Sequence, residues 1–277
     1  MKKLPFAFFL LISLFFISSC DIIESPMKER PDTFEGSGRK ILVYDFTAHK
    51  CINCPSGHEA IEELEELYGD SLIVTVSIHC TDWADIKPPQ AGTYTYDFRT
   101  PIGDELGGRV GQTGCYYGTL SLPIGLVNNL SKDELLSHTG WASATDEVIS
   151  TPSDFKISIA PSFSADSTIS CEVSIQMKEG ENRQFNLVTF LTEDSIHKDQ
   201  STHEGTNPNY THNNVLRAGF NGTWGESIPV NTQSITKKTY QLSAKNKDWQ
   251  ISNCKIVAFL YDVNSYEVLQ AEKVHIQ

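Results

Sequence analysis

Two cysteines separated by two residues, placed between a strand and a helix, constrain this chain more than any other feature. The apolar, β-rich run KILVYDF at 40–46 predicts a buried strand, and Cys51 and Cys54 follow it. The run HEAIEELEELY at 58–68 has apolar side chains at helical spacing and glutamates on the other face, and SLIVTVSIH at 71–79 predicts a second strand. This order predicts a βαβ unit with parallel strands and a right-handed crossover.

The C-x-x-C pattern alone is ambiguous, because it also serves zinc sites and short structural disulfides. Zinc would need a second ligand pair, which His79 and Cys80 could supply, but the chain has no second C-x-x-C. At a helix N-terminus a thiolate gains from unsatisfied N–H groups and from the helix dipole. His49 and Lys50 directly precede Cys51 and are expected to favour its thiolate further. The context therefore favours a redox pair, with no metal and no cofactor expected.

The segment DFTAHKCINC at 45–54 resembles the active-site segment of thioredoxins, which has an Asp-Phe pair and an Ala at the same spacing from its C-x-x-C. The resemblance implies a thioredoxin-like domain in which Cys51 is the exposed nucleophile and Cys54 the resolving thiol. It also implies that Asp45 is a buried carboxylate that exchanges protons with the resolving cysteine. The alternative for Asp45 is a strand-end residue in solvent. By the same resemblance, Pro123 is the cis proline that faces the disulfide.

The motif also departs from the thioredoxin pattern. Lys50 stands where that family usually has Trp, and Ile52-Asn53 stands where it usually has Gly-Pro. Pro55 follows the motif directly. These differences leave the redox potential and the substrate open, but not the fold.

The character of the chain changes near residues 150–153. Before this point we expect a helix near 101–110, a strand within 121–128 and a last helix from Ser131 to Val148. After it, long helical patterns are absent, and five β-rich runs separated by glycine, asparagine and proline predict a β-sandwich: 154–160, 168–177, 184–192, 238–242 and 255–263. The expected fold class is therefore α/β plus all-β, with a thioredoxin-like domain at 40–150 and a β-sandwich domain at 151–277.

Four further cysteines are candidates for structural disulfides. Cys80 and Cys115 fall in the first expected domain and could tie down the long segment between them. Cys171 shares the register of a strand whose alternate residues are apolar, so it is expected to face the core, and it could pair with Cys254. Each could equally be a buried free thiol. The pairing cannot be read from the sequence.

The N-terminus has the layout of a secretory signal, because Lys2 and Lys3 precede an apolar run at 6–17 that is short for a membrane span. Ile17-Ser18-Ser19-Cys20 resembles the bacterial lipobox, which implies a signal peptide at 1–19 and lipidation of Cys20. Several acyl chains on one residue would anchor the protein to a membrane, with residues 20–39 as a polar tether. An uncleaved anchor helix and a plain signal cleaved elsewhere are the alternatives.

The charge of the chain argues against one class of partner. Its formal net charge is −13, and loss of the two lysines of the signal would make it −15. A surface of this sign repels nucleic acid, so no nucleic-acid partner is expected. His197, His203 and His212 lie in a polar stretch with several acidic residues, but their spacing matches no metal-ligand pattern and predicts a solvated loop.

A second resemblance covers most of the mature chain. The chain is similar to the outer-membrane-protein-28-related lipoproteins of Gram-negative bacteria in the following segments, in order: CINCP (51–55), ELYGD (66–70), DFRTP (97–101), LPIGLVN (122–128), HNNVLR (212–217) and GTWGE (222–226). The resemblance implies a thioredoxin-like domain, a C-terminal β domain and an outer-membrane location, on the periplasmic or the surface face.

Two functions remain open at this stage. The first is a membrane-tethered thiol–disulfide oxidoreductase that acts on disulfides or thiols of exported proteins through Cys51 and Cys54. The second is a non-catalytic binding or adhesion lipoprotein, in which the thioredoxin-like domain is a scaffold and the C-x-x-C a structural bridge.

Overall fold

The predicted βαβ unit is present. The computed structural model of the chain describes residues 38–108, 114–118, 120–178, 184–229 and 235–277. In it, β1 (Ile41–Thr47), α1 (Cys54–Tyr68) and β2 (Ile73–His79) follow in order, and β1 pairs with β2 in parallel from Ile41 opposite Ile73. The expected signal peptide, Cys20 and nearly all of the tether lie outside the described residues.

The local sequence explains where α1 begins and ends. Pro55 occupies the first turn, where its missing N–H leaves no hydrogen bond unmade. Gly69 follows the helix with a φ of 93°, a conformation that glycine adopts without steric cost, and its N–H donates to the Glu65 carbonyl. The helix buries Ile61 and Leu64 against the sheet.

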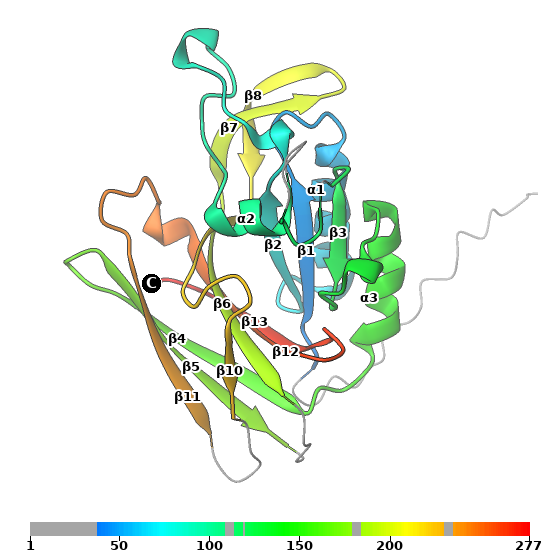
Figure 1. The fold of residues 1–277 in the computed structure, drawn as a ribbon, viewed down its shortest axis with the longest axis vertical. Coiled ribbons are helices and arrows are strands. Elements are labelled where there is room, and N and C mark those ends of the chain that lie inside the picture. The colour runs from blue at the N-terminus through cyan, green and yellow to red at the C-terminus, as the bar shows by residue number, and fades with distance from the viewer. Residues whose placement is uncertain (1–37, 109–113, 119, 179–183, 230–234) are drawn as a thin grey trace, which may run out of the picture. The chain divides into compact units, whose positions relative to one another are not determined.

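The main sheet joins strands from both sides of residue 150. Among the described residues it has the order β13-β12-β6-β9-β2-β1-β3, with β10 beside β6 (Figure 1). Its further strands are β3 (Ile124–Val127), β6 (Phe185–Glu193), β9 (Val215–Gly219), β10 (Glu226–Ile228), β12 (Cys254–Asp262) and β13 (Val268–His275). β9 pairs with both β2 and β6, so one sheet contains strands from both sides of the expected domain boundary. That boundary, near residues 150–153, stays a prediction.

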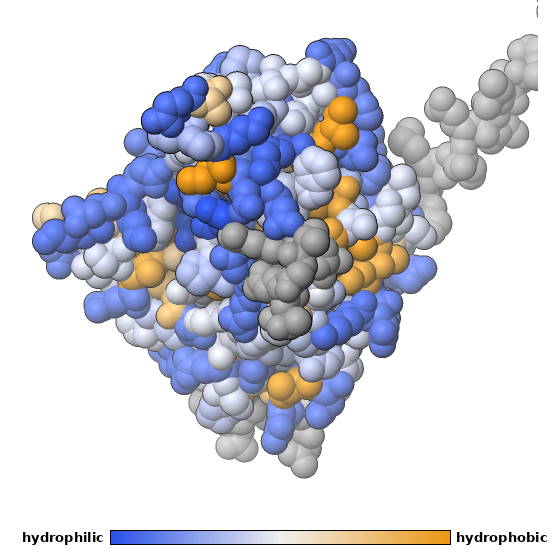
Figure 2. Space-filling model, turned by 45° about the horizontal axis from the view of Figure 1, so that its top comes forward, coloured by the Kyte–Doolittle hydropathy of each residue, from blue (hydrophilic) through white to orange (hydrophobic). Residues whose placement is uncertain are grey.

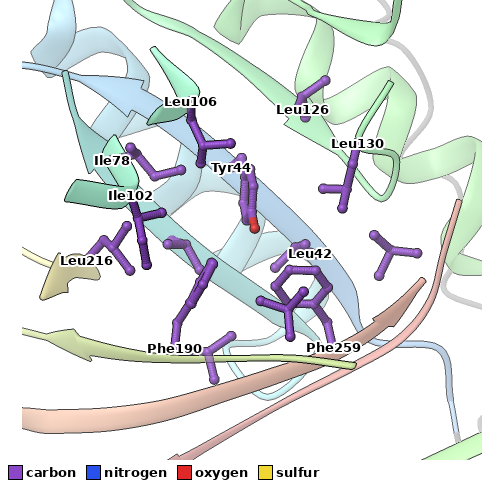
Figure 3. Close-up of a cluster of buried hydrophobic side chains, with 14 of the residues drawn as sticks. Leu42, Tyr44, Ile78, Ile102, Leu106, Leu126, Leu130, Phe190, Leu216 and Phe259 are labelled. Atoms are coloured by element: carbon purple, nitrogen blue, oxygen red, sulfur yellow. The ribbon is translucent and has the colours of Figure 1, made fainter. Parts of the chain in front are cut away.

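Strand alternation in β1 separates two apolar clusters. Ile41 and Val43 point toward α1 and α3 (Trp141–Ile149), where they pack with Trp141. Leu42, Tyr44 and Phe46 point to the other face, toward α2 (Pro101–Leu106) and the strands β6 and β12. Figure 3 shows the cluster that contains Leu42 and Tyr44, in which Tyr44 lies between Leu106 and Phe190. Asp45 has the parity of Ile41 and Val43, so it faces the side of the sheet that carries α1.

A second core lies between β6, β12 and a separate three-stranded sheet. That sheet has the order β11-β5-β4, formed by β4 (Phe155–Phe163), β5 (Thr168–Met177) and β11 (Thr236–Ser243). Alternate residues of β5 are buried, from Ile169 to Met177, and they pack with Leu187 and Ile256. The mixed α/β fold with several sheets and few helices therefore agrees with the expected fold class at this coarse level.

Two expectations about local structure are wrong. The helix expected from Ser131 to Val148 begins only at Trp141, and two short 3₁₀ turns precede it, at Lys132–Glu134 and His138–Gly140. The polar stretch expected to be a loop forms a hairpin, β7 (Ile196–Thr202) with β8 (Gly205–His212), because its mostly polar strands gave no apolar alternation to detect.

The remaining 3₁₀ turns are Asp82–Ala84, Pro89–Ala91 and Ile251–Asn253. No helix within the described ranges has the length and apolar character needed to cross a membrane.

Candidate functional site

Cys51 and Cys54 lie where β1 leads into α1. Cys54 is the first residue of the helix, and Cys51 stands in the turn before it, with its N–H donating to the Ala48 carbonyl over 3.1 Å. Cys51 is 6% exposed and Cys54 is fully buried. Cys51 is therefore the more accessible of the two thiols, but it is far less exposed than expected. Ala48, Ala84 and Leu122 pack around the two sulfurs and cover most of Cys51.

The two thiols have opposite electrostatic environments. A hydrogen bond from the Cys54 thiol lowers the pKa of Cys51, and the N–H groups of Asn53 and Cys54 lower it further, although burial acts in the opposite direction. Burial raises the pKa of Cys54 strongly, and its hydrogen bond to Cys51 raises it further. Cys51 is therefore the thiol of the pair that loses its proton more readily, as the helix N-terminus predicts.

Asp45 is completely buried beside this pair, which excludes the alternative of a strand-end residue in solvent. Neither of its carboxylate oxygens has a hydrogen-bond partner of standard geometry among the described residues. Burial raises its pKa to about 7, the Ser77 side chain acts in the opposite sense, and the charge of Cys51 raises it again. Such a carboxyl is partly ionised near neutral pH and can accept or release a proton there.

Pro123 packs against the start of α1. The Leu122–Pro123 peptide bond is cis, as the thioredoxin resemblance implies, and the Cys51 thiol donates to the Leu122 carbonyl over 3.7 Å. Gly57 permits this close approach, because a Cβ at that position would lie 3.1 Å from the Pro123 Cβ and 3.6 Å from Asp45 Oδ1. The structure thus brings together Asp45, Cys51, Cys54 and Pro123.

The expected help from His49 is absent. His49 is 1% exposed, and burial lowers the pKa of its imidazole, so the ring is neutral near pH 7. Lys50 is not among the groups that lower the pKa of Cys51, which is set by hydrogen bonds instead. Sequence proximity alone overstated the effect of both side chains.

Among the described residues, all six cysteines are free thiols: Cys51, Cys54, Cys80, Cys115, Cys171 and Cys254. The sulfurs of Cys80 and Cys115 lie against the adjacent glycines Gly107 and Gly108, so the two residues approach the same short segment. Cys171 and Cys254 are both buried in the second core, as expected of Cys171. The disulfides Cys80–Cys115 and Cys171–Cys254 stay predictions.

The β7–β8 hairpin adds residues that the sequence did not identify. The Gln200 side chain is fully buried and donates to the Cys51 carbonyl over 2.9 Å. The hydroxyl of Tyr210 lies 2.8 Å from Nδ1 of His58, a residue of α1. Gln200 and Tyr210 lie about 150 residues beyond the motif in the sequence. No local pattern predicts their contacts with the motif and with α1, and only the tertiary structure reveals them.

His212 contradicts the expectation of a solvated histidine loop. It is 1% exposed, its ring centroid lies 4.6 Å from that of Phe98, and burial lowers its pKa to about 3. His197 and His203 remain on the exposed side of the hairpin, where His197 meets the Thr211 hydroxyl at 3.2 Å. Within the described parts of the chain, no group of three or more histidine, cysteine or carboxylate residues could hold a metal ion.

Comparison with known families decides what kind of chain this is. The family model of outer membrane protein Omp28 matches residues 111–277, which is more than half of the chain. The chain belongs to the Omp28 family. The outer-membrane location expected from the sequence is the location of this family. The matched range begins after Cys51 and Cys54, so family membership does not itself describe the dithiol site.

Two solved structures are similar to this member of the Omp28 family. HBP35 of Porphyromonas gingivalis aligns with a TM-score of 0.62 and 14% identity, over 87% of this chain and 76% of that chain, which shows a shared fold. A domain of the outer membrane lipoprotein Omp28 from Porphyromonas gingivalis aligns with a TM-score of 0.33 and 22% identity, over 45% of this chain and 89% of that domain. No curated protein sequence matches the chain.

Proposed function

We propose that this Omp28-family protein is a thiol–disulfide oxidoreductase of the outer membrane that acts on exported proteins. The observation that carries the proposal is the asymmetry of the two thiols. Cys51 is stabilised as a thiolate by hydrogen bonds, whereas Cys54 is kept protonated by burial until its proton is removed. A reactive nucleophile next to a shielded resolving thiol is what disulfide exchange requires.

The reaction takes two steps. The Cys51 thiolate attacks one sulfur of a substrate disulfide, an S–S bond to Cys51 forms, and the other substrate sulfur leaves as a thiolate. Asp45 then takes the proton of Cys54, and the new thiolate attacks Cys51. The Cys51–Cys54 disulfide forms, and the substrate, reduced by two electrons, leaves as a thiol. The reverse sequence oxidises a substrate dithiol, and a second dithiol or disulfide resets the protein.

Exposed apolar side chains near Cys51 suit a polypeptide substrate. Ile52, within the motif, is 44% exposed, and Trp83, whose carbonyl accepts a hydrogen bond from the Lys50 N–H, is 57% exposed. The face of the molecule in Figure 2 is mostly hydrophilic, with separate hydrophobic patches. Apolar groups beside a reactive sulfur favour cysteine-containing segments of incompletely folded proteins.

The finer architecture belongs to the same proposal. We take residues 40–150 as a thioredoxin-like domain and 151–277 as a β-sandwich, supported by the β1–α1–β2 unit with cis Pro123 and by the facing of two sheets over one apolar core. Lipidated Cys20, after cleavage of a signal at 1–19, would tether the protein to the membrane. Mass spectrometry of the mature N-terminus tests this point, because Cys20→Ala should remove the acyl chains.

Trapping of mixed disulfides tests the function itself. Cys54→Ser should accumulate disulfides between Cys51 and substrate proteins, visible on non-reducing gels and lost after addition of a thiol. Cys51→Ser should trap none, and Cys171→Ser is the matched control that leaves both site cysteines in place. If Cys54→Ser traps nothing in cells and nothing with a model disulfide, the proposal is wrong and a non-catalytic binding lipoprotein takes its place.

A further inference from the structure

The β7–β8 hairpin closes over the dithiol site. Ser201 N–H donates to the His49 carbonyl over 2.8 Å, and Gln200 donates to the Cys51 carbonyl. In Figure 1 the hairpin lies beside the upper end of β1, next to the start of α1. These two hydrogen bonds, one from the hairpin backbone and one from the Gln200 side chain, hold the hairpin against the motif, although the hairpin forms its own two-stranded sheet.

A continuous chain of hydrogen bonds runs from the resolving thiol to this hairpin. The Thr47 side chain is hydrogen-bonded to Cys54, and Thr47 Oγ1 lies 3.0 Å from His58 Nε2. On the other side of the ring, His58 Nδ1 lies 2.8 Å from the Tyr210 hydroxyl. Asp45 Oδ2 lies 3.6 Å from the same Nε2, so the proposed proton acceptor and the Thr47 hydroxyl both meet one edge of the imidazole.

The far end of the chain reaches solvent. Tyr210 lines an open cleft of about 600 Å³ together with Ile52 and Pro55 of the motif segment. His58 itself has a side chain that is only 16% exposed. The imidazole therefore lies between the buried Asp45 carboxyl on one side and the Tyr210 hydroxyl on the other. Tyr210 in turn lines the open cleft.

Burial keeps the His58 ring neutral, because it lowers the pKa of the imidazole to about 4. The titratable groups that meet His58 from the elements packed against it are Asp45 of β1, His79 of β2, and Tyr210 and His212 of β8. Glu62 of α1 lines a small pocket with His58 and Tyr210, and Cys54, Glu59 and Glu62 all act on the pKa of Tyr210. A neutral imidazole has one N–H donor and one acceptor nitrogen, so it can accept a proton at one nitrogen as it releases one from the other.

We propose that His58 and Tyr210 form a proton relay that connects Asp45 and Cys54 to solvent. The relay deepens the proposed function and rests on it. When Cys54 attacks the mixed disulfide, its proton passes to Asp45 and on to His58 Nε2, as the Nδ1 proton moves to the Tyr210 oxygen and the hydroxyl proton moves to water in the cleft. One proton leaves the buried site in this step, and Asp45 is the same carboxylate after the attack as before it.

This relay solves a problem that burial creates. Asp45 holds the proton that it takes from Cys54 until another group removes it, and it has no direct path to water because it is fully buried. The hairpin residue Tyr210 supplies the missing end of that path. The hairpin is therefore part of the reaction machinery and not only a cover.

Resolution kinetics test the relay. Reduced full-length mature protein is mixed with oxidised glutathione, quenched with acid, and analysed by mass spectrometry for the Cys51–glutathione adduct and for the internal disulfide, across a range of pH. His58→Gln should slow the second step roughly 100-fold, and Tyr210→Phe roughly tenfold, within the range of general acid–base effects. Adduct formation at Cys51 should change less than about twofold, because its thiolate is stabilised by other groups.

The matched control is Tyr94→Phe. The Tyr94 hydroxyl lies 2.7 Å from Ser201 Oγ and 2.7 Å from Thr206 Oγ1, so this variant also removes a tyrosine hydroxyl that contacts the hairpin. It touches no member of the relay, and resolution should stay within about twofold of the wild-type rate. A loss equal to that of Tyr210→Phe would mean that the hairpin acts only through its position, and the relay would be wrong.

Chemical rescue separates proton transfer from packing. His58→Ala opens space beside the cleft, and added imidazole should restore resolution in proportion to its free-base concentration. Slow variants that imidazole does not rescue, with an unchanged solvent isotope effect, would contradict the relay. If wild type resolves the adduct and both relay variants match it, the relay is wrong and the oxidoreductase function stands. If wild type never forms or resolves the adduct, the function itself fails, and the relay with it.

Discussion

The two buried cysteine pairs of this protein lie in opposite surroundings. Cys51 and Cys54 lie at the start of a helix, next to a buried carboxyl and within reach of hydrogen-bond donors. Cys171 and Cys254 lie in the apolar core between two sheets, and burial raises the pKa of Cys171 to about 11 and that of Cys254 to about 12. Burial raises the pKa of each of these thiols, and at Cys51 the hydrogen bonds to the sulfur outweigh the effect of burial.

The two regions also differ in which polar groups they bury. The second core is built mainly from apolar side chains of β5, β6 and β12, although the Thr189 hydroxyl and one Glu193 oxygen of β6 are buried without a hydrogen-bond partner of standard geometry among the described residues. The region around the motif buries the ionisable side chains of Asp45, His79 and His212, whose polar atoms also lack such partners. Unsatisfied buried groups are costly, and they are expected where chemistry requires them.

The largest effect on disulfide exchange should come from replacing one cysteine with serine in each region. Cys51→Ser should abolish disulfide exchange, because it removes the nucleophile. Cys171→Ser should leave exchange unchanged but lower the free energy of unfolding by roughly 1–3 kcal/mol, because a hydroxyl would be buried in an apolar core. Exchange rates and urea unfolding of both variants measure this. The contrast breaks down if Cys171→Ser also loses exchange while remaining folded.

Asp45→Asn should change stability in a pH-dependent way. Asp45 holds its proton more tightly in the folded chain, with a pKa of about 7 against an ordinary value of 3.8. Its contribution therefore favours the folded state at low pH and is lost as pH rises from about 4 to about 7, by about 4 kcal/mol in total.

The asparagine variant lacks this loss, so its unfolding free energy relative to wild type should rise across that interval and then level off. Urea unfolding at several pH values measures the difference. His58 contributes with the opposite sign, since its lowered pKa costs stability as pH falls from 6.5 to about 4, and this part cancels in the difference. A pH-independent difference would mean that Asp45 is ionised normally.

Gly57→Ala tests how tightly α1 packs on the site. The added Cβ would lie 3.1 Å from the Pro123 Cβ, so the helix start must shift, and stability should fall by about 1 kcal/mol with a several-fold slower exchange. Gly140→Ala is the matched control, because the closest atom to its added Cβ is 3.8 Å away. Equal effects of the two substitutions would show that the close approach at Gly57 is unimportant.

Lys50→Ala should have the smallest effect. The pKa of Cys51 is lowered by hydrogen bonds from Cys54 and from backbone N–H groups, and Lys50 is not among the causes. Alkylation of Cys51 as a function of pH should therefore keep nearly the wild-type midpoint. A clear upward shift would restore the simpler view that the neighbouring lysine activates the thiol.

The sequence predicted the site where its signals are local. The β1–α1–β2 unit follows from apolar periodicity, and the buried position of Asp45 and the cis bond before Pro123 follow from the thioredoxin resemblance. The hairpin could not be foreseen, because β8 (GTNPNYTH) is polar and mostly exposed and shows no alternation. The contact between Tyr210 and His58 joins residues 152 apart, and only long-range packing creates it.

The pH dependence of alkylation at single cysteines tests the central claim most directly. Reduced mature protein is treated with iodoacetamide across a range of pH, and each cysteine is quantified by peptide mass spectrometry. Cys51 should react with a midpoint below the ordinary value of 9.0, while Cys54, Cys171 and Cys254 stay unmodified in the folded protein. A Cys51 midpoint at or above 9.0, or reaction no faster than that of Cys171, would contradict the account.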